Sequence, residues 1–535
     1  MTDRAKIITT CAFLLILVVS VWLGALQVPF VYDDFVHIVD RPGNLGIAQA
    51  LRGGYQETRP LFNIVVWGIK VLFGNSLYAF HGLSLLLHSI STILVFLLAR
   101  RLMPETGFSA PLLVAALFGL HPVQSESVCY INSLSGLLSG LFFILTLLIA
   151  PPLAVQKGKA GIRFATAFTF LLALLSKESA AIAPLALFLV DFVAMKRQAP
   201  GSETAGDLKN FFRLFLAKRW ELIAIAVATL IVLFTVFKNP HKGMAGTDVM
   251  SIKTFFLTQL VTVPWFVRLW FWPDNLSILH HPTLHYTLFF LPLLGLLGIM
   301  TAILLAYRLL GRMPGLFLGL SLFLVTILPT NSLLPLRDFA SERFLYIPSL
   351  GLAIVLSCIV MHIPEMLPFK LKSAGPVAFI LLAGPYAMAA YARVQVWQDP
   401  LRLWSEAVVE CPGSVRARTN LARQLGKRKM YSQAIAVLNP AIERAPREPG
   451  PRLNRGAARL LEGDAKGALE DYEVVAALYP HYKDPWIGIT RAYLAMGNYH
   501  AARESAKELI KLDPKNKLAK KVLSSNKTES LDNSR

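Results

Sequence analysis

Long apolar runs are the feature of this sequence that most restricts its fold. The first extends from Ile7 to Leu26, and similar runs recur as far as about residue 391. A helix that crosses a bilayer needs about 20 mostly apolar residues. Because lipid offers no hydrogen-bond partner to the backbone, only helices and closed barrels cross it. The runs are continuous rather than alternating, so the sequence predicts an all-α, polytopic membrane protein.

Composition supports this class, since 55% of the residues are hydrophobic and only 16% are charged. We read the first run as a retained anchor, because no small-residue cleavage site precedes Val28. The run at 254–272 contains a proline and an arginine and ends in tryptophans, so we expect it at the outer interface. Eleven spans are predicted, near residues 7–27, 79–99, 110–121, 132–150, 163–176, 179–195, 221–237, 286–307, 314–329, 343–361 and 376–391.

The net charge of +20 is distributed in a way that indicates topology rather than nucleic-acid binding. Basic residues fill alternate connections, the pattern of cytoplasmic loops, which places the N-terminus in the cytoplasm and the C-terminus outside. These residues include Arg4, Lys6, Arg100, Arg101, Lys157, Lys196, Arg219, Arg308 and Lys370. Most of the acids that attract interest lie in the intervening, extracytoplasmic connections. We therefore expect any chemistry on that side.

The first outer connection, residues 28–78, is the part of the membrane domain that most suggests function. Its length of about 50 residues far exceeds the two to eight residues usual between bundle helices. Adjacent acids, Asp33 and Asp34, follow the first run directly, and acids kept at a membrane boundary are functional candidates by default. The apolar segment Leu61 to Phe73 is expected to be an in-plane amphipathic helix.

A second domain is predicted from an internal repeat with a period of 34 residues. Ala434, Ala468 and Ala502 recur at this interval, as do prolines that close each unit. This period and pattern are typical of tetratricopeptide (TPR) repeats, in which pairs of antiparallel helices stack. The domains expected are a membrane domain at 1–396, a TPR α-solenoid at 397–516 and a polar tail at 517–535. The solenoid consists of a half repeat and three repeats, about 415–448, 449–482 and 483–516.

Cysteine and histidine usage does not point to a metal centre. The four cysteines lack CxxC spacing. Only Cys129 and Cys411 could share the outer compartment, and their spacing does not predict a disulfide. The adjacent His280 and His281 cannot easily face one ion, so we expect no metal site there.

Several short motifs support a family resemblance across nearly the whole chain. In order they are YDD at 32–34, RPL at 59–61, HPVQSESV at 121–128, SKE at 176–178, PDNLS at 273–277 and ERFLYIPS at 342–349, followed by the TPRs. With these motifs the chain resembles the TMTC family, the transmembrane and TPR-containing protein O-mannosyltransferases of the GT-C superfamily, or a bacterial relative. Each motif is weak alone, and their order carries the resemblance.

The resemblance implies a GT-C transmembrane helix bundle that acts as an inverting glycosyltransferase on a polyprenyl-phosphate-linked sugar. Such a reaction needs a carboxylate to take the acceptor proton and cations to stabilise the leaving phosphate. By position, Asp33 matches the family's general base. Asp34 would orient the acceptor or bind a divalent cation. The alternative is that this acidic pair caps an interfacial helix.

Three cations are candidates for the donor phosphate. Lys177 could hold the phosphate as a point charge, or form a local ion pair with Glu178. Arg343 could bind it bidentately, or form a salt bridge with Glu342 or Asp338. Arg59 could close the first loop over the donor, or extend to the interface as a snorkelling side chain.

Three further residues are candidates for the pocket. Glu178 could position the donor or meet the acceptor. Glu126 could border the sugar or cap a helix. His121 could line the site or pack beside Pro122. Family members carry an arginine and an acid where this chain has Leu134 and Gly136, so the resemblance does not carry over the identity of the sugar.

We expect the TPRs to select a protein acceptor, because a stack of helix pairs presents a binding surface near the active site. A non-enzymatic TPR scaffold for envelope assembly and a GT-C enzyme with a lipid or glycan acceptor are the alternatives. Compact loops favour a bacterial inner membrane with periplasmic TPRs. The expected partners are the polyprenyl-phosphate-linked sugar, the acceptor protein and membrane lipid, without nucleic acid.

Overall fold

A computed structural model describes the protein at residues 2–41, 46–51, 59–153, 160–198, 208–236, 252–280, 290–310, 313–331, 340–366 and 374–525. Within these ranges the regular elements are helices, and none is a strand. The predicted all-α class with helical repeats at the C-terminus is therefore confirmed. The chain divides into two compact units, residues 1–399 and 400–535, which are described separately.

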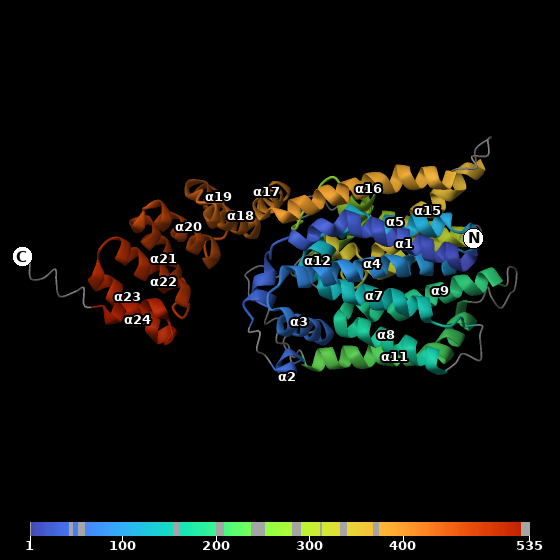
Figure 1. Ribbon diagram of the computed structural model, residues 1–535, viewed down its shortest axis with the longest axis horizontal. Coiled ribbons are helices and arrows are strands. Elements are labelled where there is room, and N and C mark those ends of the chain that lie inside the picture. Colours follow the sequence, from blue (N-terminus) through green and yellow to red (C-terminus); the bar gives the residue numbers. More distant parts are fainter. Residues whose placement is uncertain are drawn as a thin grey trace, which may run out of the picture. The chain divides into compact units, whose positions relative to one another are not determined.

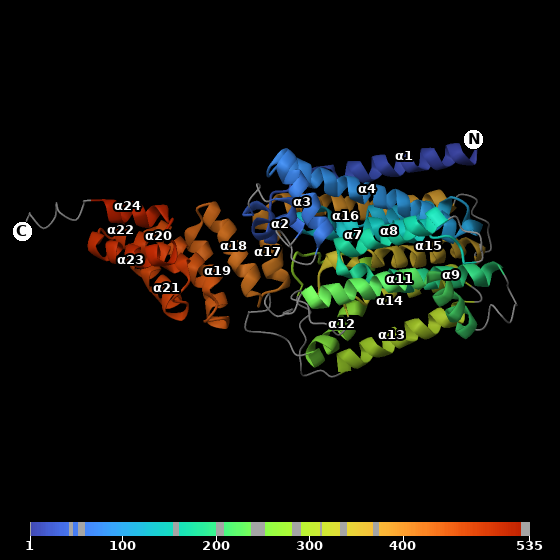
Figure 2. The same ribbon diagram turned by 90° about the horizontal axis from the view of Figure 1, so that it is seen from below.

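The first unit is the apolar helix bundle (Figures 1 and 2). Its α-helices are α1 (Asp3–Trp22), α2 (Ile47–Leu51), α3 (Pro60–Phe73), α4 (Leu77–Leu102), α5 (Ser109–Gly119), α6 (Ser125–Cys129), α7 (Leu134–Ile149), α8 (Ala160–Ser176), α9 (Ala183–Gln198), α11 (Leu208–Val236), α12 (Ile252–Phe271), α13 (Phe290–Leu309), α14 (Pro314–Ile327), α15 (Pro348–Met366) and α16 (Ala374–Gln398). Short tighter or wider turns of helix join them at η1 (Leu23–Gln27), η2 (Phe35–Val39), η3 (Pro104–Thr106), η4 (Pro122–Gln124), η5 (Ile131–Ser133), η6 (Glu178–Ile182) and η7 (Glu342–Leu345).

Length and composition identify which helices could cross a membrane. Among the described residues, seven helical segments are long and apolar enough, and an eighth results if α5 and the bent segment after it form one span. That pair meets at an angle of 45° at His121 and Pro122. Four more apolar helices, α3, α8, α14 and part of α15, are shorter. The predicted number of eleven spans stays a prediction.

The bundle has two chemically different ends, which α7 connects. At its start, the backbone N–H of Asn132 donates to Asp34. Just beyond its last turn, Ala150 accepts a hydrogen bond from Arg101 and Pro151 accepts one from Arg219. Sixteen helical residues separate these ends by roughly 24 Å. We call them the Asp34 end and the Arg101 end, and both views show α2 and α3 opposite the N-terminus.

The chain leaves this unit at the Asp34 end. Gln398, the last residue of α16, donates a 2.8 Å hydrogen bond to the carbonyl of Gly24 in η1. Beside it, the ring of Trp397 stacks on that of Tyr130, with centroids 6.2 Å apart. The segment that enters the second unit therefore starts next to the connection that carries the two aspartates.

Two helices were expected to lie along the membrane surface. The predicted helix at 61–73 corresponds to α3, which is short and apolar. The helix α12, which contains Pro264, is among the seven segments long enough to span. Length and composition do not distinguish α12 from a span, so its interfacial position stays a prediction.

Close backbone contact between α14 and α15 supports the wall of the bundle nearest the site. A Cβ atom added to Gly351 would lie 2.5 Å from the backbone nitrogen of Phe323 and 2.6 Å from the carbonyl oxygen of Gly319. Small residues allow helices to pack this closely where lipid removes the hydrophobic driving force between them. The start of α15 follows η7, the turn that carries the candidate residue Arg343.

The second unit consists of paired helices that repeat along the chain. They are α17 (Pro400–Glu410), α18 (Val415–Lys427), α19 (Tyr431–Arg444), α20 (Pro449–Glu462), α21 (Ala465–Leu478), α22 (Lys483–Ala495), α23 (Tyr499–Leu512) and α24 (Lys517–Ser524). Small residues sit where partner helices meet: a Cβ on Gly456 would lie 2.9 Å from the Tyr472 ring. These pairs correspond to the helical repeats expected from the 34-residue period.

The prediction of a polar tail from residue 517 needs correction. Residues 517–524 form α24, whose Ala519 and Val522 are buried against Leu509 and its neighbours on α23. The apolar face of this short helix covers the last repeat. The sequence did not indicate this face, because the segment carries several charged residues. The remainder of the predicted polar tail, 526–535, lies outside the described residues.

We predict that Gly351→Ala destabilises the bundle by about 1–3 kcal/mol, because the added methyl group would force two backbones apart. Thermal denaturation of the purified protein in detergent measures the effect. Gly298→Ala is the matched control, since nothing lies within 4 Å of a Cβ at this position of α13. Equal denaturation midpoints for the two variants would contradict the close crossing.

Candidate functional site

Asp34 is a buried residue that organises the first connection. Its side chain is fully buried, and its two oxygens accept hydrogen bonds from the backbone N–H groups of Val31 at 3.0 Å and Asn132 at 2.8 Å. Burial raises the pKa of the Asp34 carboxyl to about 8, and the neighbouring Asp33 carboxylate adds to the rise. Asp34 therefore ties this connection to the start of α7, a geometry that favours positioning over cation binding or helix capping.

Asp33 differs from Asp34 in its exposure. It is partly exposed, and it follows Tyr32, whose φ angle of 51° lies in the left-handed region that non-glycine residues rarely adopt. Such strain persists only where surrounding contacts hold it, and it clusters at functional sites. The contacts here include Lys70 of α3, whose ammonium group donates to the carbonyl of Arg41 at 2.6 Å. The connection is thus held from both sides, with Asp33 accessible.

Arg59 and Glu178 form an ion pair that joins the end of the first connection to η6. The Arg59 Nη2 and Glu178 Oε1 atoms lie 3.2 Å apart, and Arg59 Nη1 donates to Ser135 Oγ at 2.9 Å. Both expected residues therefore lie together at the Asp34 end. Neither the free snorkelling proposed for Arg59 nor a Lys177–Glu178 hydrogen bond occurs among the described contacts.

Glu126 and Arg343 form the most buried ion pair among the candidate residues. Glu126 is fully buried, and its Oε1 lies 2.6 Å from Arg343 Nη1, whereas Oε2 accepts from the backbone N–H of Arg343 at 3.0 Å. Ser341 Oγ lies 2.7 Å from both carboxylate oxygens. Glu126 is thus a salt-bridge partner of Arg343, in addition to the two acids, Glu342 and Asp338, that the sequence suggested. The other expected partner, Asp338, lies outside the described residues.

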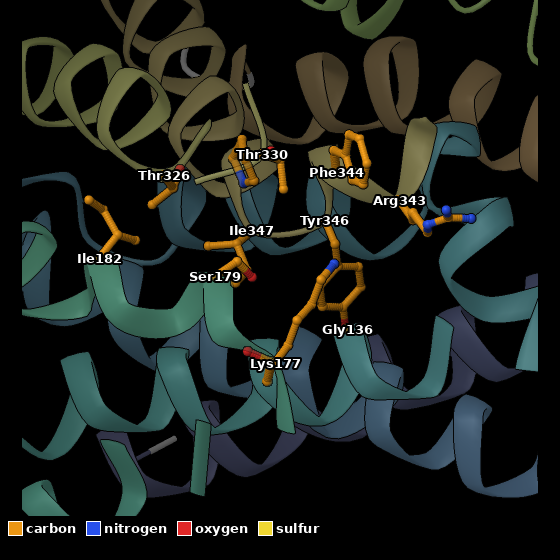
Figure 3. A pocket seen from close by; sticks show the side chains of 12 residues that line it. Gly136, Lys177, Ser179, Ile182, Thr326, Thr330, Arg343, Phe344, Tyr346 and Ile347 are labelled. Carbon is orange, nitrogen blue, oxygen red and sulfur yellow. The ribbon is translucent and has the colours of Figure 1, made fainter. Parts of the chain in front are cut away.

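Lys177 lines a cavity at the Asp34 end (Figure 3). The cavity is small and partly open, with about 20 Å³ available to the centre of a water-sized sphere. It is lined by Gly136, Ser139, Lys177, Ser179, Ile182, Thr326, Thr330, Arg343, Phe344, Tyr346, Ile347 and Pro348. Figure 3 shows the ammonium group of Lys177 next to Tyr346, whereas the guanidinium group of Arg343 points away from it.

The charge state of Lys177 is sensitive to this environment. Burial, and then the positive charge of Arg59, lower the pKa of the Lys177 ammonium to about 7, although Glu178 opposes the shift. Its Nζ lies 5.7 Å from the centroid of the Phe344 ring. Among the described residues, Lys177 has no hydrogen bond or ion pair. It is therefore the cation of this group available to a ligand.

Two other residues of the motifs, His121 and Glu342, have local partners. His121 stacks on Trp270, and its Nε2 and Nδ1 atoms pair with the carbonyl of Trp270 at 2.8 Å and the N–H of Val123 at 3.2 Å. These contacts agree with a packing role for His121 outside the cavity. Glu342, which we did not select, is fully buried and lies 3.0 Å from His280 Nε2.

The segment from Glu126 to Ser139 connects all the candidate groups, and sequence reasoning missed its importance. Tyr130 contacts Tyr32, Trp397 and Arg343 through its ring. Beyond it, Asn132 binds Asp34, Ser135 binds Arg59, and a Cβ on Gly136 would lie 4.0 Å from Lys177 Nζ. Of the two positions where the chain departs from the family pattern, Leu134 is buried in the core and Gly136 lines the cavity. The sequence signal that could have indicated this segment is the position of Leu134 and Gly136 shortly after the HPVQSES motif.

A resident metal is not indicated by the described residues, which contain no group of three or more potential His, Cys, Asp or Glu ligands. His281 lies outside the described residues, and His280 pairs with Glu342. All four cysteines are free.

The fold and this site define a class: a multi-pass helical membrane protein with a charged site at one end of its bundle and a C-terminal TPR array. A tetratricopeptide repeat family model matches residues 459–525. The chain is 23% identical over 473 residues to the protein O-mannosyl-transferase F38B6.6 of Caenorhabditis elegans, covering 82% of this chain. It is 21% identical over 527 residues to human protein O-mannosyl-transferase TMTC3 and 24% identical over 484 residues to mouse TMTC4.

These comparisons confirm the resemblance to the TMTC-type protein O-mannosyltransferases. The matches cover 86% of this chain for human TMTC3 and 76% for mouse TMTC4. They cover 64% of the worm protein, 54% of the human protein and 62% of the mouse protein, so this chain spans between half and two thirds of these relatives. These relatives are themselves named as protein O-mannosyl-transferases.

We predict that Glu126→Gln lowers stability by about 3–5 kcal/mol, because removing one charge leaves the Arg343 guanidinium without its buried partner. Thermal denaturation in detergent measures the loss. Asp3→Asn is the matched control, since its pair with Arg100 is exposed and contributes at most about 1 kcal/mol. A Glu126→Gln variant as stable as Asp3→Asn would contradict a structural role for the buried pair.

Proposed function

We propose that this protein transfers a sugar, with inversion, from a polyprenyl-phosphate donor to a hydroxyl group of a protein. The observation that carries the proposal is the charge balance around the cavity. The group contains Arg59, Lys177 and Arg343 with the carboxylates Glu126 and Glu178, and each arginine is paired with one carboxylate. Lys177 is therefore the cation of this group that has no ion pair among the described residues. A phosphodiester-linked sugar carries one negative charge, which matches it.

The proposed reaction uses both parts of the site. Asp33 takes the proton of the acceptor hydroxyl as the oxygen attacks the anomeric carbon of the sugar. The bond between this carbon and the phosphate oxygen breaks, and the polyprenyl phosphate leaves with the electron pair. Lys177, with the two arginines behind it, stabilises the charge that develops on the phosphate. Asp34 holds the connection in place by accepting the two backbone N–H groups.

The position of the acceptor in this proposal follows from the direction of the chain. The segment leaving α16 lies at the Asp34 end, beside η1. A TPR array attached there would hold a captured protein at high effective concentration near Asp33. The positive-inside pattern supports an extracytoplasmic site, and we propose a bacterial inner membrane with periplasmic TPRs.

We predict that Asp33→Asn abolishes transfer while expression and thermal stability stay normal, with a loss of about 10²–10⁴-fold in rate from removing a general base. The measurement is the intact mass of envelope proteins from cells with each variant, in which transfer adds the mass of a sugar. Asp40→Asn is the matched control, because Asp40 is an exposed acid of the same connection. A TPR scaffold would instead leave protein masses unchanged in every strain, including the wild type.

Deleting residues 400–535 tests the acceptor. If the shortened protein no longer modifies proteins but still consumes the polyprenyl-phosphate-linked sugar, the TPRs select the acceptor. If it still modifies a lipid or glycan as the full-length protein does, the acceptor belongs to that alternative class.

We predict that kcat/KM for the donor falls as the pH rises through about 7, because Lys177 loses the proton that gives it its charge. Rates measured between pH 5.5 and 9 test this sign. Lys177→Arg should keep activity at higher pH, since a guanidinium stays charged. A fall that persists above pH 8 in this variant would be assigned to another group, such as Asp34. An identical fall near pH 7 in both proteins would contradict the role of Lys177.

A further inference from the structure

One face of α7 carries small residues toward the cavity in a repeated pattern. Ser135, Gly136, Ser139 and Gly140 form two Ser-Gly pairs spaced four residues apart, which places them on one face of a helix. Three of them have a neighbour from the site. Ser135 accepts from Arg59, Gly136 lies against Lys177, and a Cβ on Gly140 would lie 2.5 Å from the Tyr346 ring.

Ser139 is the member of this face whose hydrogen-bonding capacity is unused. Its side chain is fully buried, it lines the cavity, and its Oγ atom has no hydrogen-bond partner among the described residues. A buried hydroxyl group without a partner costs free energy, and most such groups in folded proteins are satisfied. The hydroxyl group of Ser139, which lines the same cavity as Lys177, could therefore form a hydrogen bond with a polar ligand in that cavity.

The charge of the ligand follows from the residues around the cavity. Lys177 supplies an ammonium group near Gly136, one helical turn from Ser139. The two nearby arginines are bound to Glu178 and Glu126, so they are less available for direct contact. No carboxylate lines the cavity among the described residues. Hydroxyl and ammonium donors without an acceptor carboxylate favour a small anion with several acceptor oxygens.

We propose that Ser139 and Lys177 bind the phosphate group of the lipid-linked donor, and of the polyprenyl phosphate that remains after transfer. This inference rests on the proposed function for the identity of the lipid and deepens it, by assigning the direct phosphate contacts to a serine and a lysine rather than to the arginines. Gly136 keeps the space beside Lys177 open, and Arg59 and Arg343 act through their carboxylate partners as positioning residues. The sugar would then lie on the Tyr130 side, toward Asp33.

Binding of undecaprenyl phosphate to the full-length protein in detergent tests the proposal without requiring turnover. We expect Ser139→Ala to weaken binding by about tenfold, the loss typical of a hydrogen bond to a charged group. Ser357→Ala is the matched control, because Ser357 is equally buried and also lacks a hydrogen-bond partner among the described residues, yet does not line the cavity. Gly136→Ala, whose added methyl group meets only Lys177 at 4.0 Å, should also weaken binding without unfolding the protein.

The outcomes separate this inference from the proposed function. Equal affinities for wild type, Ser139→Ala and Ser357→Ala would overturn it even if the wild type transfers sugar. A loss in Ser139→Ala seen only with mannosyl phosphoryl undecaprenol, and not with the bare lipid phosphate, would also overturn it, because the hydroxyl group would then contact the sugar. Ser139-dependent binding in a wild type that transfers no sugar would support the phosphate site and reject the transferase. If millimolar inorganic phosphate competes with undecaprenyl phosphate, the phosphate group alone is recognised. If it does not compete, the lipid contributes to binding.

Discussion

The buried ion pair between Glu126 and Arg343 is the contact on which the arrangement of the site depends. It joins residues 217 positions apart and draws the segment before α15 onto the bend between α5 and α7. A fully buried carboxylate is tolerated only when several donors surround it. Ser341, the backbone of Arg343 and its guanidinium group supply those donors. The guanidinium carbon of Arg343 also lies 5.7 Å from the ring centroids of Tyr130 and Phe344, so the same side chain contacts both rings.

Pairing within the site also determines which charge a ligand meets. The arginines, whose forked guanidinium groups suit carboxylates, are engaged by Glu126 and Glu178. The remaining cation, Lys177, is the one whose charge the surroundings can change near neutral pH. In the proposed function, this site therefore binds the anion through one ammonium group, and the paired charges lie around it. The same ordering separates the aspartates, since Asp34 is used to hold the connection and Asp33 is left accessible.

Sequence reasoning found the residues of the site but not their partners. Asp34, Arg59, Glu126, Glu178 and Arg343 were each selected from motifs. Their grouping depends on contacts between segments up to 217 residues apart, which local patterns do not encode. The polar tail expected from residue 517 begins with a packed helix, α24. The alternative for Arg343 was a salt bridge with Glu342 or Asp338, and the structure adds Glu126 as a partner that neighbours in the chain did not suggest. Ser139 and Tyr130 were missed because a serine and a tyrosine in an apolar segment resemble ordinary core residues.

The sequence by itself determined the class of this protein, because apolar runs of spanning length and a 34-residue repeat each permit few folds. It also determined where the acids and cations fall along the chain, through the alternation of basic and acidic connections. Only the tertiary structure decided which of those charges cancel one another, since cancellation depends on distances of about 3 Å between side chains from different helices. The result is two arginines paired with carboxylates and, among the described residues, one lysine without an ion pair that lines a cavity, and no single segment contains it.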